Sequence, residues 1–364
     1  MTHGAGPTPQ HVLGVPFLPP GIVTAGGNRA RAALGRLHAR MAPPPVRILE
    51  ALFGLLGHRV LVALCEVGVP EALTSPAHPG DLARRRGVDP ARLERLLRFA
   101  ATRGWVRIDR RGRVRPTRVT AFLRRDHPGG WRSWVDFAGG GEVVNAVTCL
   151  SVDGSDSFAA AHGKAFFDWM AEHPERWGIF DRAMAAGGRM HALTLARVVD
   201  WSTTRTVCDV GGGTGDLLAA LLDLVPGLEG TVLDLPPVVA RAVHHDRLTP
   251  LAGNAFAAVP GGFDTYLLVN VLHDWSDGDA GRILGRVAEA LAPGARAVVL
   301  ESDHPAVPRD DFAVAADVLM AALTNGGKER SAAEFAALGR ACGLRLARTH
   351  RLASGDLAHE FQRG

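Results

Sequence analysis

The chain has 364 residues, which is long enough for two domains that each bury a core of their own. Hydrophobic residues make up 47% of it and charged residues 21%, a composition typical of soluble globular proteins. The net charge of +4 is too small to indicate a polyanionic partner by itself, and the four cysteines show no metal-binding spacing. We expect reduced thiols in a cytoplasmic protein and no cysteine-based metal site.

The N-terminal segment, residues 1–44, is rich in glycine and proline, and we expect a flexible tail with one short basic helical stretch from Asn28 to Met41. Prolines interrupt the apolar residues at the start, so no secretory signal is expected. The next apolar segment, Ile48–Val69, is not expected to span a membrane because charged and polar residues interrupt it: Glu50, His58, Arg59 and Glu66.

Residues 45–150 predict a helical domain that contains a winged helix. Its first helix, Ile48–Leu64, is apolar on most of its circumference, which indicates burial in a core or in a subunit interface. A short helix beginning at Pro79, a helix from Pro90 to Arg103 and an alternating hairpin around Arg111-Gly112 complete the pattern. A DNA-binding regulator has the same shape, and residues 84–132 are dense in arginine. Against DNA binding, the second helix carries an apolar set: Leu93, Leu96, Leu97, Phe99 and Ala100.

Residues 151–364 predict an α/β domain, helix-rich until Trp201 and then alternating between strands and helices. Five strands alternating with helices imply a parallel, doubly wound sheet, and the gap between the last two strands is too short for a crossover, so these two should form an antiparallel hairpin. The result is the seven-stranded methyltransferase variant of the Rossmann fold. The expected strands are Thr206–Val210, Thr231–Leu235, Thr249–Ala252, Tyr266–Val271, Arg296–Glu301, Leu344–Arg351 and Ala358–Gln362; the expected helices are Asp216–Leu224, Pro236–His245, Gly278–Leu291, Phe312–Leu323 and Ala332–Cys342.

A glycine-rich loop follows the first of these strands. Asp209 precedes the glycines at 211, 213 and 215, which allow positive φ and a close approach of the backbone to a ligand. A second carboxylate, Asp234, ends the next strand about 20 residues later, where nucleotide-binding folds hold a ribose. A loop in which an acidic residue precedes the glycines suits a ligand with a cationic amino-acid end and no pyrophosphate, so we expect S-adenosylmethionine. Candidate cofactor-binding residues are Asp209, Gly211, Gly213, Gly215, Asp234 and Leu235.

Candidate catalytic residues follow the next strands of the sheet. His273 and Asp274 come after the strand Tyr266–Val271, Glu301 ends the strand after it, and Glu329 lies between two later helices. A histidine can take the proton of a phenol while a methyl group is transferred to its oxygen, and carboxylates can hold the ring in the required tautomer. We therefore expect these side chains to converge at one edge of the sheet. No metal is expected.

Four motifs, in this order and spacing, resemble those of the caffeic-acid-type O-methyltransferases of plants and their bacterial relatives that modify natural products. The resemblance covers roughly residues 45–364. The motifs are the glycine loop from Asp209, Asp234-Leu-Pro-Pro, Leu272-His-Asp-Trp-Ser-Asp and Gly326-Gly-Lys-Glu-Arg-Ser.

The resemblance implies a role for each matching residue. His273 would be the general base, flanked by Glu301 and Glu329, and Asp234 would bind the ribose. The family's adenine-binding segment is here Gly253-Asn254-Ala255-Phe256, in which Asn254 replaces an acid, and the family's lysine before the histidine motif is absent. Phe180 and Met184 match positions close to the cofactor. The resemblance also implies a homodimer, joined through the N-terminal domain.

The acceptor is expected to be a flat, apolar molecule with a hydroxyl group, aromatic or polyketide-like. Candidate substrate-binding residues are Phe166, Trp169 and Met320, although aromatic and Met residues at helical spacing are more often part of a core. One alternative stays open: some relatives bind the same cofactor but carry out hydroxylation, decarboxylation or pericyclic steps.

Overall fold

The computed structural model describes residues 21–127, 129–151, 153–304 and 312–364, so the first 20 residues of the expected tail lie outside it. The chain divides into two compact units, which we describe separately. The winged-helix unit comprises Ala33–Val144 and Glu175–Ala186, and the described part of the sheet unit comprises residues 21–32, Asn145–Pro174 and Gly187–Gly364. Three helices contribute to both units: α2 (Gly21–Met41), α9 (Gly141–Thr148) and α12 (Pro174–Val198).

Helix α2 is longer than the helical stretch expected from Asn28, because it already begins at Gly21. The domain boundary expected near residue 150 remains a prediction, since each unit contains segments from both sides of that residue.

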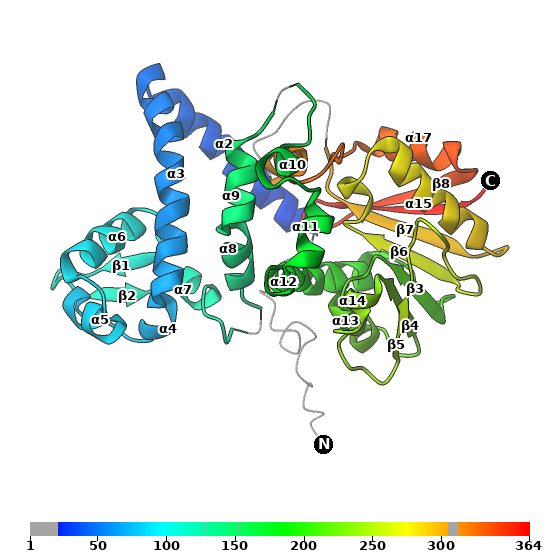
Figure 1. Cartoon of the computed structure of the whole chain (residues 1–364), viewed down its shortest axis with the longest axis horizontal. Coiled ribbons are helices and arrows are strands. Elements are labelled where there is room, and N and C mark those ends of the chain that lie inside the picture. Colours follow the sequence, from blue (N-terminus) through cyan, green and yellow to red (C-terminus); the bar gives the residue numbers. More distant parts are fainter. Residues whose placement is uncertain (1–20, 128, 152, 305–311) are drawn as a thin grey trace. The chain divides into compact units, whose positions relative to one another are not determined.

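The winged-helix unit confirms the predicted helix-turn-helix and wing (Figure 1). Strands β1 and β2 pair antiparallel, and one cluster of buried side chains, including Leu64, Leu82, Leu93, Leu97 and Val114, joins the helices to the wing. The apolar face of α6 is therefore used for packing. The elements are α3 (Pro44–Val67), α4 (Val69–Ala72), α5 (Pro79–Arg86), α6 (Pro90–Thr102), β1 (Val106–Ile108), β2 (Val114–Pro116), α7 (Arg118–Phe122) and α8 (Arg132–Ala138).

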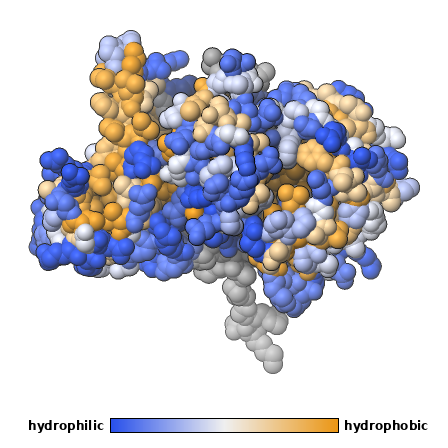
Figure 2. Space-filling view, viewed as in Figure 1, coloured by the Kyte–Doolittle hydropathy of each residue, from blue (hydrophilic) through white to orange (hydrophobic). Residues whose placement is uncertain are grey.

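Helix α3 exposes an apolar face. Ile48, Leu52 and Leu55 are each more than 60% exposed within the chain, and Figure 2 shows apolar residues gathered along this helix. Among the described residues, α3 is also the one helix long and apolar enough to cross a membrane by length and composition, with 22% of its most apolar window buried. An exposed apolar face of this kind indicates a surface that a partner subunit or lipid covers.

The sheet unit contains the predicted seven-stranded sheet in the order β5-β4-β3-β6-β7-β9-β8. The first five strands of that order are parallel, and β9 is antiparallel to both β7 and β8, so the expected C-terminal hairpin is confirmed. The strands are β3 (Thr206–Val210), β4 (Glu229–Asp234), β5 (Leu248–Ala252), β6 (Thr265–Val269), β7 (Arg296–Glu301), β8 (Leu344–Arg351) and β9 (Leu357–Arg363).

Helices cover both faces of this sheet because successive strand residues point to opposite faces. Val207 of β3 packs with the C-terminal part of α12 and with α13, whereas Cys208 packs with α15 and α17. The remaining helices are α10 (Ser157–His162), α11 (Phe166–Glu172), α13 (Asp216–Leu224), α14 (Pro236–Val239), α15 (Asp277–Ala290), α16 (Phe312–Leu323), α17 (Ala332–Ala341) and the 3₁₀ turn η1 (Leu272–Asp274).

The helix expected over Pro236–His245 is wrong in length, because α14 ends at Val239. The backbone N–H of Val243 donates to the carbonyl of Thr214 in the glycine loop, so the chain leaves the helical path to pack on that loop. Strand β6 also ends earlier than expected, at Val269, since Asn270 adopts a positive φ of 53°. Asparagine tolerates this left-handed conformation better than most residues.

Candidate active site

The carboxyl ends of the parallel strands bring the predicted residues to one edge of the sheet. The glycine loop follows β3, Asp234 ends β4, the turn η1 with His273 follows β6, and Glu301 ends β7. Ligands bind at this edge in open parallel sheets. The alternation read from the sequence therefore places cofactor-binding and catalytic candidates on neighbouring strands.

The glycine loop has the conformation that its residues allow. Gly211, Gly213 and Gly215 have φ values of 72°, 62° and 80°. A Cβ on Gly213 would meet no atom within 4 Å, whereas a Cβ on Gly212 would lie 2.5 Å from the Asp209 carboxylate. The loop is thus packed tightly at Gly212 and open beside Gly213, where a ligand can approach the backbone closely.

Asp209 lies beneath this loop. Its side chain is buried, and its Oδ1 has no hydrogen-bond partner among the described residues. Burial, with a further contribution from nearby Asp234, raises the pKa of Asp209 to about 7. A buried acceptor without a partner is costly, so a donor from a bound ligand or a proton at this position would be favourable.

Asp234 joins the glycine loop to strand β4. One carboxylate oxygen accepts the N–H of Gly213 at 2.8 Å, and the other accepts the N–H of Leu235 at 2.7 Å. Leu235 is 36% exposed and precedes α14. The carboxylate is thereby fixed at the end of its strand, in the position where this type of fold binds a ribose.

The segment after β5 holds the two remaining cofactor candidates of this unit. The side-chain oxygen of Asn254 accepts the N–H of Phe256 at 2.9 Å, which fixes a turn that also contains Ala255. Asn254 is exposed and Ala255 is partly buried. Their contact with an adenine ring remains a prediction.

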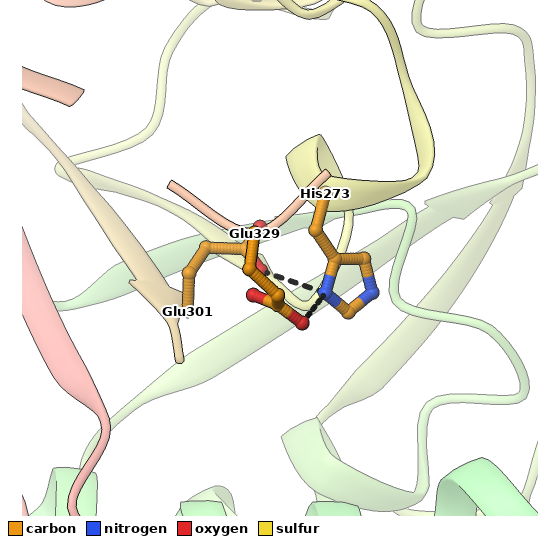
Figure 3. Close-up of side chains that lie close together, drawn as sticks. All are labelled: His273, Glu301 and Glu329. Atoms are coloured by element: carbon orange, nitrogen blue, oxygen red, sulfur yellow. Dashed lines mark hydrogen bonds and ion pairs between the residues drawn. The ribbon is translucent and has the colours of Figure 1, made fainter. Parts of the chain in front are cut away.

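The structure brings His273, Glu301 and Glu329 together (Figure 3). Nδ1 of His273 lies 3.1 Å from Oε1 of Glu329 and 3.3 Å from Oε2 of Glu301. Both carboxylates are buried, whereas the imidazole side chain is 15% exposed. Two acceptors at Nδ1 favour a proton on that nitrogen, which leaves the lone pair on Nε2, on the other side of the ring.

Each carboxylate is itself held in place by the backbone. Oε1 of Glu301 accepts the N–H groups of Val271 at 3.1 Å and Leu272 at 2.8 Å, at the start of η1. The N–H of Glu329 donates to Asp317 of α16 at 2.8 Å. The histidine turn and the two carboxylates are therefore fixed relative to one another.

The charges in this cluster perturb one another. Burial opposes a charge on His273, but Glu301, Asp274 and Glu329 outweigh it and hold the pKa of the imidazole well above its ordinary value of 6.5. Burial raises the pKa of Glu301 to about 7 and that of Asp274 to about 6. Oδ1 of Asp274 lies 3.6 Å from Nε2, so this carboxylate lies on the side of the ring that carries the lone pair.

The same three side chains are of the types that bind metals. One possible ligand atom each from His273, Glu301 and Glu329 lies within 4.8 Å of the others, the one such group found among the described residues. Nδ1 forms a hydrogen bond with Glu329 and lies close to Glu301, whereas Oε2 of each carboxylate is buried without a hydrogen-bond partner among the described residues. Metal independence stays a prediction.

The substrate candidates lie in different surroundings. Phe166 of α11 is only 4% exposed and packs edge-on against Phe158 of α10, which indicates a core position between these two helices. Trp169 is partly buried and stacks on His173. Met320 is partly buried on α16. Their contact with a substrate remains a prediction.

Phe180 and Met184 lie on the part of α12 that belongs to the winged-helix unit, where Phe180 packs edge-on against Phe137. Their role in cofactor binding stays a prediction, as the glycine loop belongs to the sheet unit.

Two residues near the cluster lie outside the predicted set of site residues. Phe167 of α11, next to the predicted Phe166, stacks on Trp275 of the histidine motif with ring centroids 5.7 Å apart. Arg330 follows Glu329 directly, is 1% exposed and donates hydrogen bonds to the backbone around His273. The signals for Arg330 in the sequence are its position next to a predicted catalytic residue and its place in the motif Gly326-Gly-Lys-Glu-Arg-Ser.

Comparison with known proteins assigns both parts of the chain. Residues 144–345 match the O-methyltransferase domain, and residues 49–126 match the O-methyltransferase dimerisation domain, which includes the winged helix. The mitomycin biosynthesis 6-O-methyltransferase of Streptomyces lavendulae is 34% identical over 333 residues, which cover 85% of this chain and 91% of that protein.

Two further matches differ in their chemistry. The structure of an O-methyltransferase from neocarzinostatin biosynthesis, NcsB1, in complex with S-adenosylmethionine and 2-hydroxy-5-methyl naphthoic acid, is 30% identical with a TM-score of 0.71, and the match covers 87% of this chain and 98% of that one. The aclacinomycin 10-hydroxylase of Streptomyces purpurascens is 32% identical over 297 residues, 77% of this chain and 79% of that protein. The domain match covers more than half of the chain, and on that basis this protein belongs to the O-methyltransferase family.

Proposed function

We propose that this protein transfers a methyl group from S-adenosylmethionine to a hydroxyl group of an aromatic or polyketide-type small molecule, with His273 as the general base. The observation that carries the proposal is the pair of buried carboxylates at Nδ1 of His273, which leaves Nε2 to accept a proton. A phenol is mostly protonated at neutral pH, so a base at its oxygen makes it a better nucleophile.

The residues at the carboxyl edge fit the cofactor. The backbone at Gly213 is open to a ligand, Asp209 holds a buried oxygen that no described residue binds, and Asp234 presents a fixed carboxylate. When bound, S-adenosylmethionine supplies an activated methyl group on a positively charged sulfur. The loop and Asp234 would hold it through its amino-acid end and its ribose, next to the histidine turn on the neighbouring strand.

The pH dependence of turnover follows from the raised pKa of His273. The neutral imidazole is the active base, so kcat should be low below this pKa and should rise as the pH increases through it. With the pKa of His273 raised to about 10, we expect kcat to keep rising up to about pH 10, well above the range of an unperturbed histidine. In Glu329→Gln, which removes one charge at Nδ1, the rise should move to lower pH.

The pH profile needs one control, because a phenolic acceptor titrates as well. If kcat still rises with pH in His273→Gln, the rise comes from ionisation of the acceptor. A wild-type profile that is already flat above about pH 8 would contradict a raised histidine pKa, because an unperturbed imidazole is almost entirely neutral there.

The reaction is tested by mass spectrometry of mixtures containing S-adenosylmethionine and a panel of phenolic and polyketide acceptors, with and without EDTA. We expect a product heavier by one methyl group, an equal amount of S-adenosylhomocysteine, and no effect of EDTA, since the cluster holds its proton without an ion. Loss of turnover in EDTA that added metal restores would contradict metal independence.

A second candidate function is hydroxylation or another non-methylating step, favoured by the similarity to the aclacinomycin 10-hydroxylase. The cluster of His273, Glu301 and Glu329 would suit other proton transfers as well. An oxygenated product without an added methyl group, formed while S-adenosylmethionine is not consumed, would support this candidate over methyl transfer.

We further propose a cytoplasmic homodimer in which a partner subunit covers the apolar face of α3. This helix lies largely within the segment that matches the dimerisation domain, and its exposed residues Ile48, Leu52 and Leu55 recur at helical spacing. A subunit interface accounts for the apolar face without a membrane.

Substituting Leu52→Glu and Leu55→Glu together should convert the dimer to monomers, since two charges would be buried without partners in the interface. Light scattering coupled to size-exclusion chromatography measures the mass. Glu66→Gln, at an exposed position of the same helix, is the control and should remain dimeric. An unchanged mass in the double variant would place the interface elsewhere.

A further inference from the structure

The turn that carries His273 has little support of its own. Turn η1 contains three residues, and its internal hydrogen bonds are long: Asp274 N–H to Val271 O at 3.4 Å and Trp275 N–H to Leu272 O at 3.3 Å. It follows Asn270, whose positive φ is the one such value among the described non-glycine residues. A short 3₁₀ turn after a strained residue keeps a precise geometry only if its surroundings impose it.

Glu301 supports one side of this turn, by accepting the N–H groups of Val271 and Leu272. Arg330 supports the carbonyl groups. Its Nη1 donates at 2.7 Å to the carbonyl of Leu272, which otherwise accepts only the long bond from Trp275, and its Nη2 donates at 2.7 Å to the carbonyl of Trp275. These two carbonyls belong to residues on either side of the pair His273-Asp274.

Arg330 is fully enclosed, with 1% of its surface exposed. Its Nε donates to Asp277 at 2.8 Å, so the charge has a partner at the start of α15. The planar guanidinium can reach two carbonyls and a carboxylate at once because its N–H groups point in fixed directions. A lysine offers one charged nitrogen and cannot reproduce this set.

The segment that carries Arg330 also carries Glu329, and it lies directly against the turn. A Cβ on Gly327 would lie 2.6 Å from the carbonyl oxygen of His273, so only glycine allows this approach. Glu329 contacts the imidazole ring, and Arg330 binds the backbone that carries the ring. One segment therefore fixes both the histidine side chain and its main chain.

We propose that Arg330 is a positioning residue for the base: by holding the carbonyls of Leu272 and Trp275, it keeps Nε2 of His273 aimed at the acceptor hydroxyl. The inference rests on the proposed function of His273. A small displacement of a reacting group lowers the rate steeply even when binding is unchanged. Arg330 should therefore act on kcat and only through His273.

A double-mutant cycle separates positioning from general stability. In Arg330→Met, kcat should fall about 10- to 100-fold, while S-adenosylmethionine binding measured by calorimetry stays unchanged. In the His273→Gln background, the same substitution should lower the remaining kcat by less than about threefold, because residues that act as a unit are not additive. If Arg330→Met lowers kcat by the same factor in the wild-type and in the His273→Gln background, the inference is overturned and Arg330 is a purely structural residue.

Arg296 provides a control for stability. This arginine lies at the opposite end of the sheet, at the start of β7, and donates to Glu360 and Thr204 and to the carbonyl of Asp200. Arg296→Met should lower the melting temperature without changing kcat per folded molecule. If it lowers kcat as much as Arg330→Met does, loss of stability explains both effects and the inference fails.

If Arg330→Met does not fold, Arg330→Lys tests the same inference. It keeps the charge but cannot reach both carbonyls, so kcat should fall by a smaller factor, again only when His273 is present. An unchanged kcat in Arg330→Lys would overturn the inference while leaving the proposed function intact. An unchanged kcat in His273→Gln would instead refute the proposed function, which makes the two failures distinguishable.

Discussion

Replacing His273 by glutamine is expected to lower kcat about 100- to 10,000-fold, the range for the loss of a general base. Glutamine can still contact Glu329, but it has no nitrogen lone pair to accept the phenol proton. The affinity for S-adenosylmethionine should stay unchanged, because the glycine loop and Asp234 are not altered. Steady-state kinetics and calorimetry measure the two quantities on the same preparation.

His78→Gln is the matched control for this variant. His78 is an exposed residue before α5, and its side chain makes no capping hydrogen bond. It should retain wild-type kcat. Wild-type turnover in His273→Gln would remove this residue from the mechanism, and a large loss of cofactor affinity would indicate that it acts in binding instead.

The Asp234→Asn variant should bind S-adenosylmethionine about 10- to 100-fold more weakly, which corresponds to the loss of one or two hydrogen bonds to a charged group. The amide keeps the size of the side chain but removes the charge and offers only one acceptor oxygen. The ribose hydroxyls and the N–H groups of Gly213 and Leu235 would then compete for it. Calorimetry with purified protein gives the dissociation constant directly.

Asp264 offers a close control for Asp234. It lies before β6, at the amino end of the parallel strands, and its carboxylate also accepts two backbone N–H groups, those of Arg205 at 2.8 Å and Thr206 at 3.0 Å. Asp264→Asn should reduce stability by a similar mechanism without weakening cofactor binding. Equal affinities in Asp234→Asn and wild type would exclude Asp234 from the cofactor site.

Much of the sheet unit could be predicted from the sequence, since the succession of its strands and helices depends on local patterns. Apolar runs alternate with helical segments at regular spacing, and six residues are too few for a helical crossover between the last two strands. Because the carboxyl ends of parallel strands share one edge, the convergence of His273 and Glu301 followed from their positions after consecutive strands. Glu329 lies in a loop between two later helices, and its place in the chain predicted the same convergence, to which the resemblance to a family added a role.

The features that were missed depend on contacts between distant segments. The helix after Asp234 stops early because Val243 bonds to Thr214, and no local propensity contains that information. The chain is rich in arginine, so the residue type of Arg330 does not indicate that it is buried. The packing of its loop against η1 explains the burial. The spacing in α11 could not separate Phe166 from Phe167, since a helix of seven residues has too little pattern to define its buried face.

The most direct test of methyl transfer to oxygen is to supply S-adenosylmethionine with an isotope-labelled methyl group and to locate the label in the product by mass spectrometry and NMR. We predict the label in a methoxy group of an aromatic or polyketide acceptor, with an equal amount of S-adenosylhomocysteine, and almost none with His273→Gln. An unlabelled product that carries a new oxygen atom would contradict the account, as would a label transferred equally well without His273.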